Sequence, residues 1–400
     1  MRRIFFCAAF LLLITATIAQ AVELGDKFSI TPSVTVQEVY DSNIFKQKNN
    51  TTDSNLNGVP DFKELFGDDK MSDYLTIYAL KLDLDYPFKK HRLNFEANKD
   101  FIRFSHYDDQ NYENESLSTD LFLNLGMGFN FNPRYLYKNR VISRQNNSGR
   151  PNDFLEQNTI ELNAGYEAGN WKFVLGGNQT EYEYDIRTSL SRDVKNYKAT
   201  LTYMFSDINQ WYLKYNRRKF MFDTTAAAND NHEDDILLGA SMVFGGDNLL
   251  KMEAGHRWKT FGHASGRDFG SLVGNIKLSH QFSDLSMVTL SYERLTEVSY
   301  FRNATYYVEN SVNLDFVWQI TSKISNNWNL GYSLYDYKET TGVSATEYLE
   351  YFKAGTGLNY APHENIQLSL SYEYSLRDAN LDLRKFDAHQ VVAGFSISWK

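Results

Sequence analysis

The sequence contains little proline, the residue that interrupts strands. It also lacks the long apolar runs of helical membrane proteins. Only 6 of its 400 residues are proline, which strand interiors exclude because it cannot donate a ladder hydrogen bond. After the N-terminal segment, no stretch approaches the roughly 20 consecutive apolar residues that a membrane-spanning helix requires. Tyrosine (27) and phenylalanine (28) are abundant instead, and aromatic side chains favour strands. The composition therefore predicts long β-strands and excludes a helical membrane protein.

Cysteine is almost missing too, because the single cysteine, Cys7, lies in an N-terminal targeting segment. Two arginines and an apolar run precede residues 19–21, whose Ala-Gln-Ala sequence has the small-x-small form that signal peptidase recognises. We therefore predict a cleaved signal peptide over residues 1–21 and a single domain over residues 22–400. An exported domain without cysteine must be stable without disulfides, which favours a large hydrogen-bonded sheet.

Charge and motif content exclude two classes of function. The chain has 41 basic and 50 acidic side chains, a net charge of -9, and this acidic balance argues against a nucleic-acid partner. Histidine occurs near acidic or hydroxyl side chains at 106–109, 232–235 and 263–266. However, the sequence has no Gly-x-Ser-x-Gly elbow, no zinc-spaced histidine pair and no phosphate-binding glycine loop. We therefore predict that the protein is not an enzyme.

From residue 27 onward, apolar and polar residues alternate in segments that are separated by short and long breaks in turn. In residues 366–377, one face carries the apolar set Ile366, Leu368, Leu370, Tyr372, Tyr374 and Leu376, and the other is polar. Residues 121–131 alternate similarly, with a short turn expected at 132–134. Outer-membrane barrels alternate short periplasmic turns with longer surface loops. The alternating segments predict an all-β fold, a transmembrane antiparallel β-barrel of the bacterial outer membrane. Counting the short and long breaks between them gives about 18 strands (roughly 16 to 18).

A soluble β-sandwich also alternates in this way, but the positions of the aromatic residues favour the barrel. Lipid-facing barrels gather aromatic side chains in girdles at the strand ends. The aromatic residues close to a predicted short turn are Phe131, Trp171, Phe205, Trp211, Phe244, Phe282, Trp318, Trp328, Tyr360 and Trp399. A barrel of about 16 to 18 strands is wide enough to leave an aqueous lumen.

The first strand carries a family resemblance. Residues 30–33 read Ile-Thr-Pro-Ser and residues 40–45 read Tyr-Asp-Ser-Asn-Ile-Phe, which is similar to the opening of the putative β-barrel porin type 2 family. The resemblance implies an outer-membrane channel that exports an exopolysaccharide or capsule polymer, together with a periplasmic polysaccharide-export partner. A general diffusion porin for small hydrophilic solutes is the alternative. The C-terminus departs from the family pattern, because Lys400 follows Trp399 and the chain does not end on an aromatic residue.

The expected lumen face carries charges of both signs, which a water-filled interior tolerates. Five basic residues fall on two neighbouring predicted strand pairs and form a candidate positive stripe. They are Lys214, Arg218, Lys251, Arg257 and Lys259. A positive stripe favours an anionic polymer because it lowers the electrostatic barrier in the pore. The alternative is that these charges only solvate the wall.

The first surface loop, residues 46–72, contains a candidate calcium site. A calcium loop of this type supplies oxygen ligands from positions 1, 3, 5, 7, 9 and 12 and has glycine at position 6. Residues 53–64 meet this pattern, with Gly58 at the sharp turn. The candidate ligands are the side chains of Asp53, Asn55, Asn57, Asp61 and Glu64 and the backbone carbonyl of Val59. A polar, solvated loop without an ion is the alternative.

This candidate site makes a prediction about proteolysis of the first loop. An ion that binds only the ordered loop stabilises it by linkage, so calcium should slow cleavage within residues 51–69. The substitution Glu64→Gln should weaken binding most, because position 12 supplies two oxygens and a full charge. Cleavage rates measured with calcium and with a chelator should therefore differ in the parent protein and not in the variant. Cleavage rates that change neither with calcium nor with the substitution would support the alternative of a solvated loop without an ion.

Overall fold

The computed structural model describes residues 28–44, 72–141, 154–186, 188–223, 230–262, 268–298, 306–338, 348–379 and 385–399. The predicted signal peptide and all six candidate calcium ligands lie outside these ranges. Within them, two single 3-10 turns are present at Asp108–Gln110 and Thr188–Leu190. No helix in the described ranges is long and apolar enough to cross a membrane.

Eighteen strands make up most of the described residues, and their positions follow the alternating segments of the sequence. The strands are β1 (Ser29–Asp41), β2 (Asp73–Phe88), β3 (His91–Phe104), β4 (Tyr112–Gly126), β5 (Phe129–Val141), β6 (Phe154–Ala168), β7 (Trp171–Tyr184), β8 (Arg192–Met204), β9 (Gln210–Phe222), β10 (Asn231–Phe244), β11 (Asn248–Phe261), β12 (Phe269–Ser283), β13 (Ser286–Val298), β14 (Tyr306–Gln319), β15 (Ile324–Lys338), β16 (Tyr348–His363), β17 (Ile366–Ala379) and β18 (Phe386–Ser398). Short and long connections alternate between them, as the sequence predicts.

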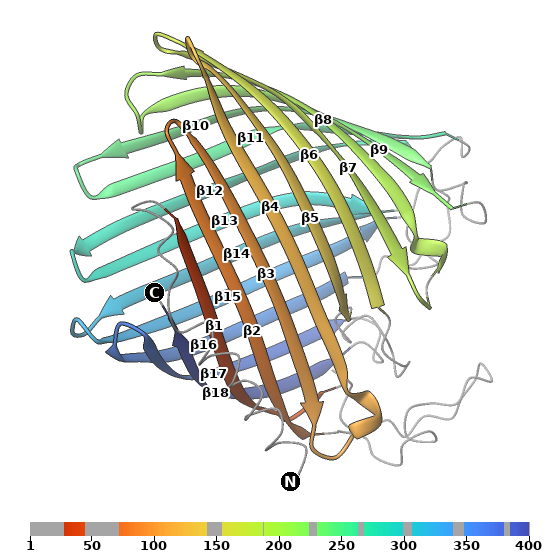
Figure 1. The fold of residues 1–400 in the computed structure, drawn as a ribbon. Coiled ribbons are helices and arrows are strands. Elements are labelled where there is room, and N and C mark those ends of the chain that lie inside the picture. The colour runs from red at the N-terminus through yellow and green to blue at the C-terminus, as the bar shows by residue number, and fades with distance from the viewer. Residues whose placement is uncertain are drawn as a thin grey trace.

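The strands form one closed antiparallel barrel (Figure 1). Each strand pairs with its neighbours in the sequence, and β1 closes the sheet by pairing with β18. The backbone N–H of Trp399 extends this seam by donating to the carbonyl of Pro32 at 3.0 Å. Closure leaves no sheet edge with unpaired backbone groups. A lipid bilayer requires this, because its hydrocarbon core holds no water that could bond such groups. The predicted transmembrane barrel of about 18 strands is therefore confirmed.

The turn between β4 and β5 was predicted at the wrong position. The sequence places it at 132–134, whereas the chain turns between the two strands at Met127 and Gly128. Gly126, Met127 and Gly128 all have positive φ angles, of 84°, 52° and 84°. Glycine adopts this conformation without steric cost, so the tight turn forms where two glycines flank a single other residue.

Pro133 lies inside β5, because a side chain supplies the hydrogen bond that proline cannot donate. The pairing of β4 with β5 lapses between the Asp120↔Arg134 and Leu123↔Phe131 pairs, which leaves Pro133 opposite the carbonyl of Leu121. The side-chain amide of Asn132 donates to that carbonyl at 3.2 Å. A proline that normally marks a turn is thus tolerated within a strand.

The apolar faces of the strands point outward, toward lipid. Leu272 and Leu370 are 67% and 54% exposed on the outside of the barrel. In a membrane barrel such apolar side chains contact lipid acyl chains and not water. Phe205, Trp211 and Trp328 are also exposed on the outside next to short turns. They belong to an aromatic girdle at the end of the barrel that carries the short turns, as the sequence predicts.

The division between the two faces can be tested with a pair of neighbouring substitutions on β17. Leu370→Arg places a charge in lipid and should lower the free energy of unfolding by about 2 kcal/mol or more. Ser371→Arg places the same charge on the opposite, inner face and should change it little. Urea unfolding of the barrel folded into lipid vesicles measures both values. Equal losses for the two variants would contradict the assignment of the faces.

Candidate functional site

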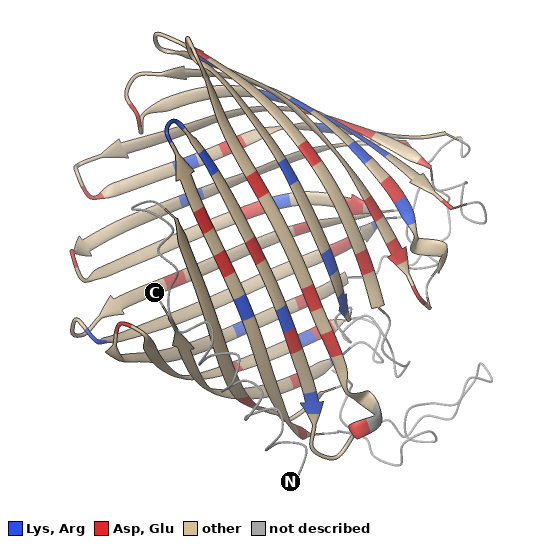
Figure 2. Cartoon of the chain, in the orientation of Figure 1, with Lys and Arg blue, Asp and Glu red and all other residues tan. Residues whose placement is uncertain are grey.

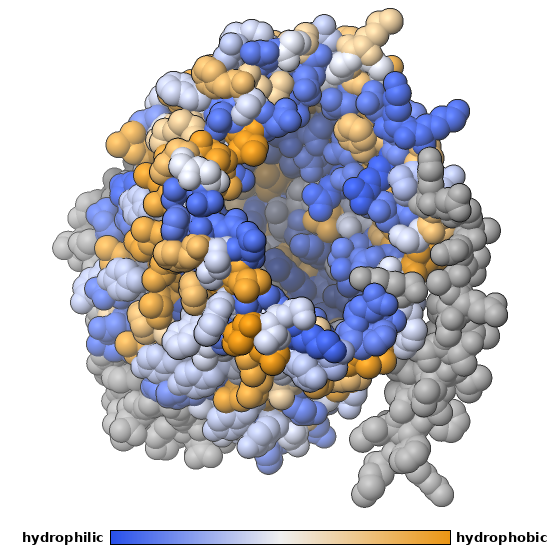
Figure 3. Space-filling view, turned by 90° about the vertical axis from the view of Figure 1, so that its left-hand side faces the viewer, coloured by the Kyte–Doolittle hydropathy of each residue, from blue (hydrophilic) through white to orange (hydrophobic). Residues whose placement is uncertain are grey.

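The candidate site is the inner wall of the barrel, called the lumen face below. Cross-strand pairs assign it to the odd-numbered positions of β1, β2, β6 and β10 to β17, and to the even-numbered positions of the other strands. Figure 3 looks into the barrel from the side of the short turns and shows a deep hollow with hydrophilic walls. Charged residues occur along the strands as well as at their ends (Figure 2).

Basic residues predominate on one arc of the lumen face, from β5 to β12. Its twelve basic residues are Arg134, Lys138, Arg140, Lys172, Arg192, Lys198, Lys214, Arg218, Lys251, Arg257, Lys259 and Lys277. Its five carboxylates are Glu161, Glu167, Glu233, Asp235 and Glu253. We call this the basic arc.

Acidic residues predominate on the remaining arc, from β13 through β18 and the closing seam to β4. Its twelve carboxylates are Glu293, Glu297, Glu309, Asp315, Glu373, Asp41, Asp73, Asp83, Asp85, Glu96, Asp100 and Asp120, and its four basic residues are Lys353, Arg377, Lys81 and Arg92. This acidic arc faces the basic arc across the closed barrel, so the two create an electric field across the lumen. Low-dielectric walls strengthen such a field.

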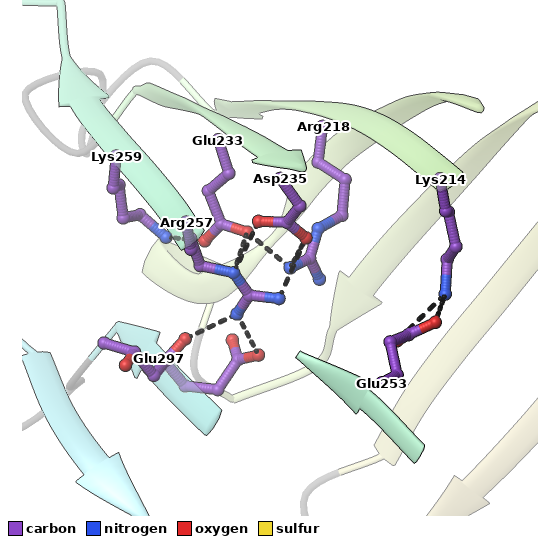
Figure 4. A network of polar contacts seen from close by, with 9 residues as sticks. Lys214, Arg218, Glu233, Asp235, Glu253, Arg257, Lys259 and Glu297 are labelled. Carbon is purple, nitrogen blue, oxygen red and sulfur yellow. Dashed lines mark hydrogen bonds and ion pairs between the residues drawn. The ribbon is translucent and has the colours of Figure 1, made fainter. Parts of the chain in front are cut away.

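A buried ion-pair network lies on the basic arc, at the end of the barrel that carries the long connections (Figure 4). Glu233 on β10 lies directly between Arg218 on β9 and Lys259 on β11. Arg218 Nη2 is 2.6 Å from Glu233 Oε2, and Lys259 Nζ donates to Glu233 Oε1. Glu233 and Lys259 are each only 1% exposed. The ammonium of Lys259 also lies 4.8 Å from the ring centroid of Phe220.

A second pair extends this network toward β13. Arg257 binds Asp235 with two hydrogen bonds, from Nε at 2.8 Å and from Nη2 at 3.1 Å. Its Nη1 donates to the carbonyl of Thr296 at 2.7 Å and reaches Glu297 Oε1 at 3.4 Å. The guanidinium therefore links β10, β11 and β13. Planar, bidentate pairing of this kind fixes side-chain geometry.

The structure places all five residues of the candidate positive stripe on the lumen face, but four of them have carboxylate partners. Lys214 pairs with Glu253 at 3.0 Å, and the network above contains the other three. Lys251 differs, because it lies directly opposite Lys277 on β12. Neither lysine forms an ion pair with a described residue, and both are exposed. Lys251 and Lys277, the lumen lysine pair, thus have no ion-pair partner among the described residues of the lumen face.

The histidine motifs do not assemble a catalytic site among the described residues. In 232–235, the pleat sends His232 and Asp234 outward while Glu233 and Asp235 face the lumen. His106 Nδ1 lies 2.7 Å from the buried carboxylate of Asp73. The motif at 263–266 lies outside the described residues. Within those residues, no group of three His, Cys, Asp or Glu side chains is placed to hold a metal ion.

Comparison with known proteins assigns the family. The sequence matches the family described as Putative beta-barrel porin 2 over residues 64–398. The chain belongs to this family. The predicted family is therefore confirmed, and this beta-barrel porin 2 protein is an outer-membrane barrel of a bacterium. No curated protein matches the chain.

Solved structures of Pseudomonas aeruginosa porins have the same fold as this family member. OpdK, crystallised with vanillate, is 11% identical, with a TM-score of 0.52 over 92% of this chain and 99% of OpdK. OccK2 (OpdF), in complex with glucuronate, is 11% identical, with a TM-score of 0.54 over 93% of this chain and 98% of OccK2. OpdL is 10% identical, with a TM-score of 0.51 over 93% of this chain and 99% of OpdL. At such identities the likeness shows the fold alone.

One feature of the lumen was not predicted from the sequence. Aromatic side chains line the lumen face toward the long connections, where Tyr307, Tyr335 and Tyr337 pack with Leu349 and Ala379. The signal was available, because aromatic residues interrupt the otherwise polar set of alternate positions in β14 and β15. In this porin the lumen face near the long connections is therefore partly aromatic.

The buried network makes a prediction about stability. Glu233→Gln removes the carboxylate shared by Arg218 and Lys259, and leaving buried charges unpaired costs about 3–5 kcal/mol. The control is Asp234→Asn on the outward face, where the carboxylate accepts from the Tyr215 hydroxyl at 2.6 Å and is more exposed. That change should cost about 1 kcal/mol or less. Equal urea midpoints for the two folded variants would contradict the buried role of Glu233.

Proposed function

We propose that this porin is a diffusion channel of the outer membrane for small hydrophilic solutes. The observation that carries the proposal is a closed 18-stranded barrel whose lumen face is mostly polar and carries a basic and an acidic arc. A barrel of about 16 to 18 strands leaves an aqueous channel, whereas about eight strands fill their interior with side chains. The hydrophilic hollow in Figure 3 agrees with such a channel.

The family and the structural relatives support diffusion better than polymer export. OpdK and OccK2 were crystallised with vanillate and with glucuronate, which are small solutes. Export of an exopolysaccharide and its periplasmic partner rest only on the family resemblance of the first strand. The candidate positive stripe would have favoured an anionic polymer, but carboxylates neutralise four of its five members.

The basic arc and the acidic arc, on opposite sides of the lumen, determine which solutes the channel should prefer. Basic and acidic residues of the lumen face nearly balance overall, so we expect weak selectivity between small cations and anions. A field across the lumen orients solutes that carry separated charges. Zwitterionic solutes and polar solutes with large dipoles should therefore pass more readily than apolar solutes of the same size.

The proposal is tested by reconstituting the purified barrel. In planar lipid bilayers it should open water-filled channels with conductance proportional to salt concentration, and in liposome swelling it should admit small zwitterions. Protein unfolded by boiling is the control. A barrel that remains closed to ions and small solutes, together with loss of surface polysaccharide in a deletion strain, would favour export instead.

The lumen lysine pair provides a sharper measurement of the same channel. Lys251→Gln with Lys277→Gln removes two positive charges from the lumen and should shift the reversal potential toward cation selectivity. The matched control removes a second pair of lysines, Lys195 and Lys219. These two residues lie opposite each other on the outside of the barrel. An unchanged reversal potential in the lumen variant would show that ions do not pass these residues.

A further inference from the structure

The outward face of β8 and β9 carries two lysines in an unfavourable arrangement. Lys195 and Lys219 are directly opposite each other in the antiparallel pair, and His232 on β10 lies beside Lys219. Like charges directly opposite are destabilising. Neither lysine forms an ion pair with a described residue, and Lys219 is exposed. We call Lys195 and Lys219 the outer lysine pair.

Other lysines on the outward face, toward the long connections, do have carboxylate partners. Lys99 lies 3.1 Å from Glu113 and 2.9 Å from Glu115. Lys338 similarly lies 2.5 Å from Asp336. The outer lysine pair is therefore an exception among the lysines of this surface, and its charge calls for a counter-ion from outside the chain.

The position of the outer lysine pair along the strands places it at the lipid headgroups. Reading β9 away from the short turns, Trp211, Leu213 and Tyr215 are exposed outward, and Lys219 follows four residues after Tyr215. Trp211 and Lys219 are eight residues apart, which is roughly 20 Å along the barrel axis for a strand tilted by about 40°. The apolar band of such barrels is about 25 Å tall. With Trp211 at its inner border, the backbone of Lys219 lies about 5 Å below the outer border, a distance that the flexible lysine side chain spans to reach the headgroups.

Neighbouring charges of both signs surround the outer lysine pair. Arg217 on the same face lies 3.9 Å from Asp234, whose carboxylate also accepts from the Tyr215 hydroxyl. Asp193 lies two residues from Lys195 and opposite Glu181 on β7, so these two carboxylates lie on the outward face, closer to the long connections than the lysines. The positive charge is therefore local to the two facing ammonium groups, which stand immediately above a lipid-facing tyrosine, Tyr197, that is 57% exposed.

We propose that the outer lysine pair, with Arg217 beside it, binds the phosphate of a phosphorylated lipid in the outer leaflet, such as lipopolysaccharide. The phosphate supplies the counter-ion that the chain lacks, and the acyl chains of the same molecule cover the apolar residues below. Basic residues near an anionic lipid surface contribute to binding in this way. This site lies on the outside of the barrel and is independent of the channel proposed above.

The experiment counts bound lipid on the intact barrel. The protein is extracted from native outer membranes in mild detergent, and bound lipopolysaccharide is measured by native mass spectrometry and by titration of delipidated barrel. Lys195→Gln with Lys219→Gln should weaken binding on the order of tenfold or more. Two controls should bind lipid as the parent does: the paired Lys99→Gln, and the double substitution of the lumen lysine pair. Heat-modifiable electrophoretic mobility shows that each variant is folded.

Three results would overturn the proposal. The first is unchanged lipid binding in the folded outer-pair variant. The second is equal competition by inorganic phosphate at the concentration of the lipid phosphate, because the site would then take a free anion and not a lipid. The third is disulfide formation between two copies carrying Lys219→Cys in the membrane, because a second copy of the chain would then cover this face.

Discussion

Backbone hydrogen bonding in a solvent that offers no partners is the constraint on which this structure depends. Each backbone N–H and C=O within the hydrocarbon layer must be paired inside the protein. The pairing of β1 with β18 meets this requirement for the whole sheet, because it removes both edges at once. Even the exception within β5 obeys it, since the Asn132 amide bonds the carbonyl that Pro133 leaves without a donor. The barrel is thus a single cooperative hydrogen-bonded ring.

Closure then determines what each side chain can do. Alternate residues of each strand face lipid or water, so the two faces of the sheet need different kinds of side chain. The outward face carries leucines and aromatic girdles, and the inner face carries the two opposed charged arcs. The buried network around Glu233 and Arg257 joins β9, β10, β11 and β13 near the long connections. It fixes the geometry of Arg218, Arg257 and Lys259, whereas the lumen lysine pair forms no ion pair with a described residue and is exposed to the lumen.

Much of the fold, and less of the site, could be predicted from the sequence. Strand number and the outward face follow from strict alternation, which is a local property. The β4–β5 turn was misplaced because Pro133 is a turn signal that one asparagine overrides. The neutralisation of the stripe was missed for another reason: Arg218, Arg257 and Lys259 pair with two carboxylates of the strand between them, Glu233 and Asp235. In the sequence they belonged to a histidine motif, 232–235, that the pleat divides between two faces. The opposed arcs could have been found by summing charges strand by strand on the polar face.

The most direct test of the account is the water accessibility of consecutive residues on one strand. Single cysteines at Ile276, Lys277, Leu278 and Ser279 on β12, in a variant whose Cys7 is replaced, can be treated in intact membranes with a charged, membrane-impermeant thiol reagent. Because the pleat alternates the faces, Lys277→Cys and Ser279→Cys should react from the aqueous lumen, and Ile276→Cys and Leu278→Cys should not. Uniform labelling, or labelling of the other two positions alone, would contradict a lipid-embedded barrel with a water-filled channel.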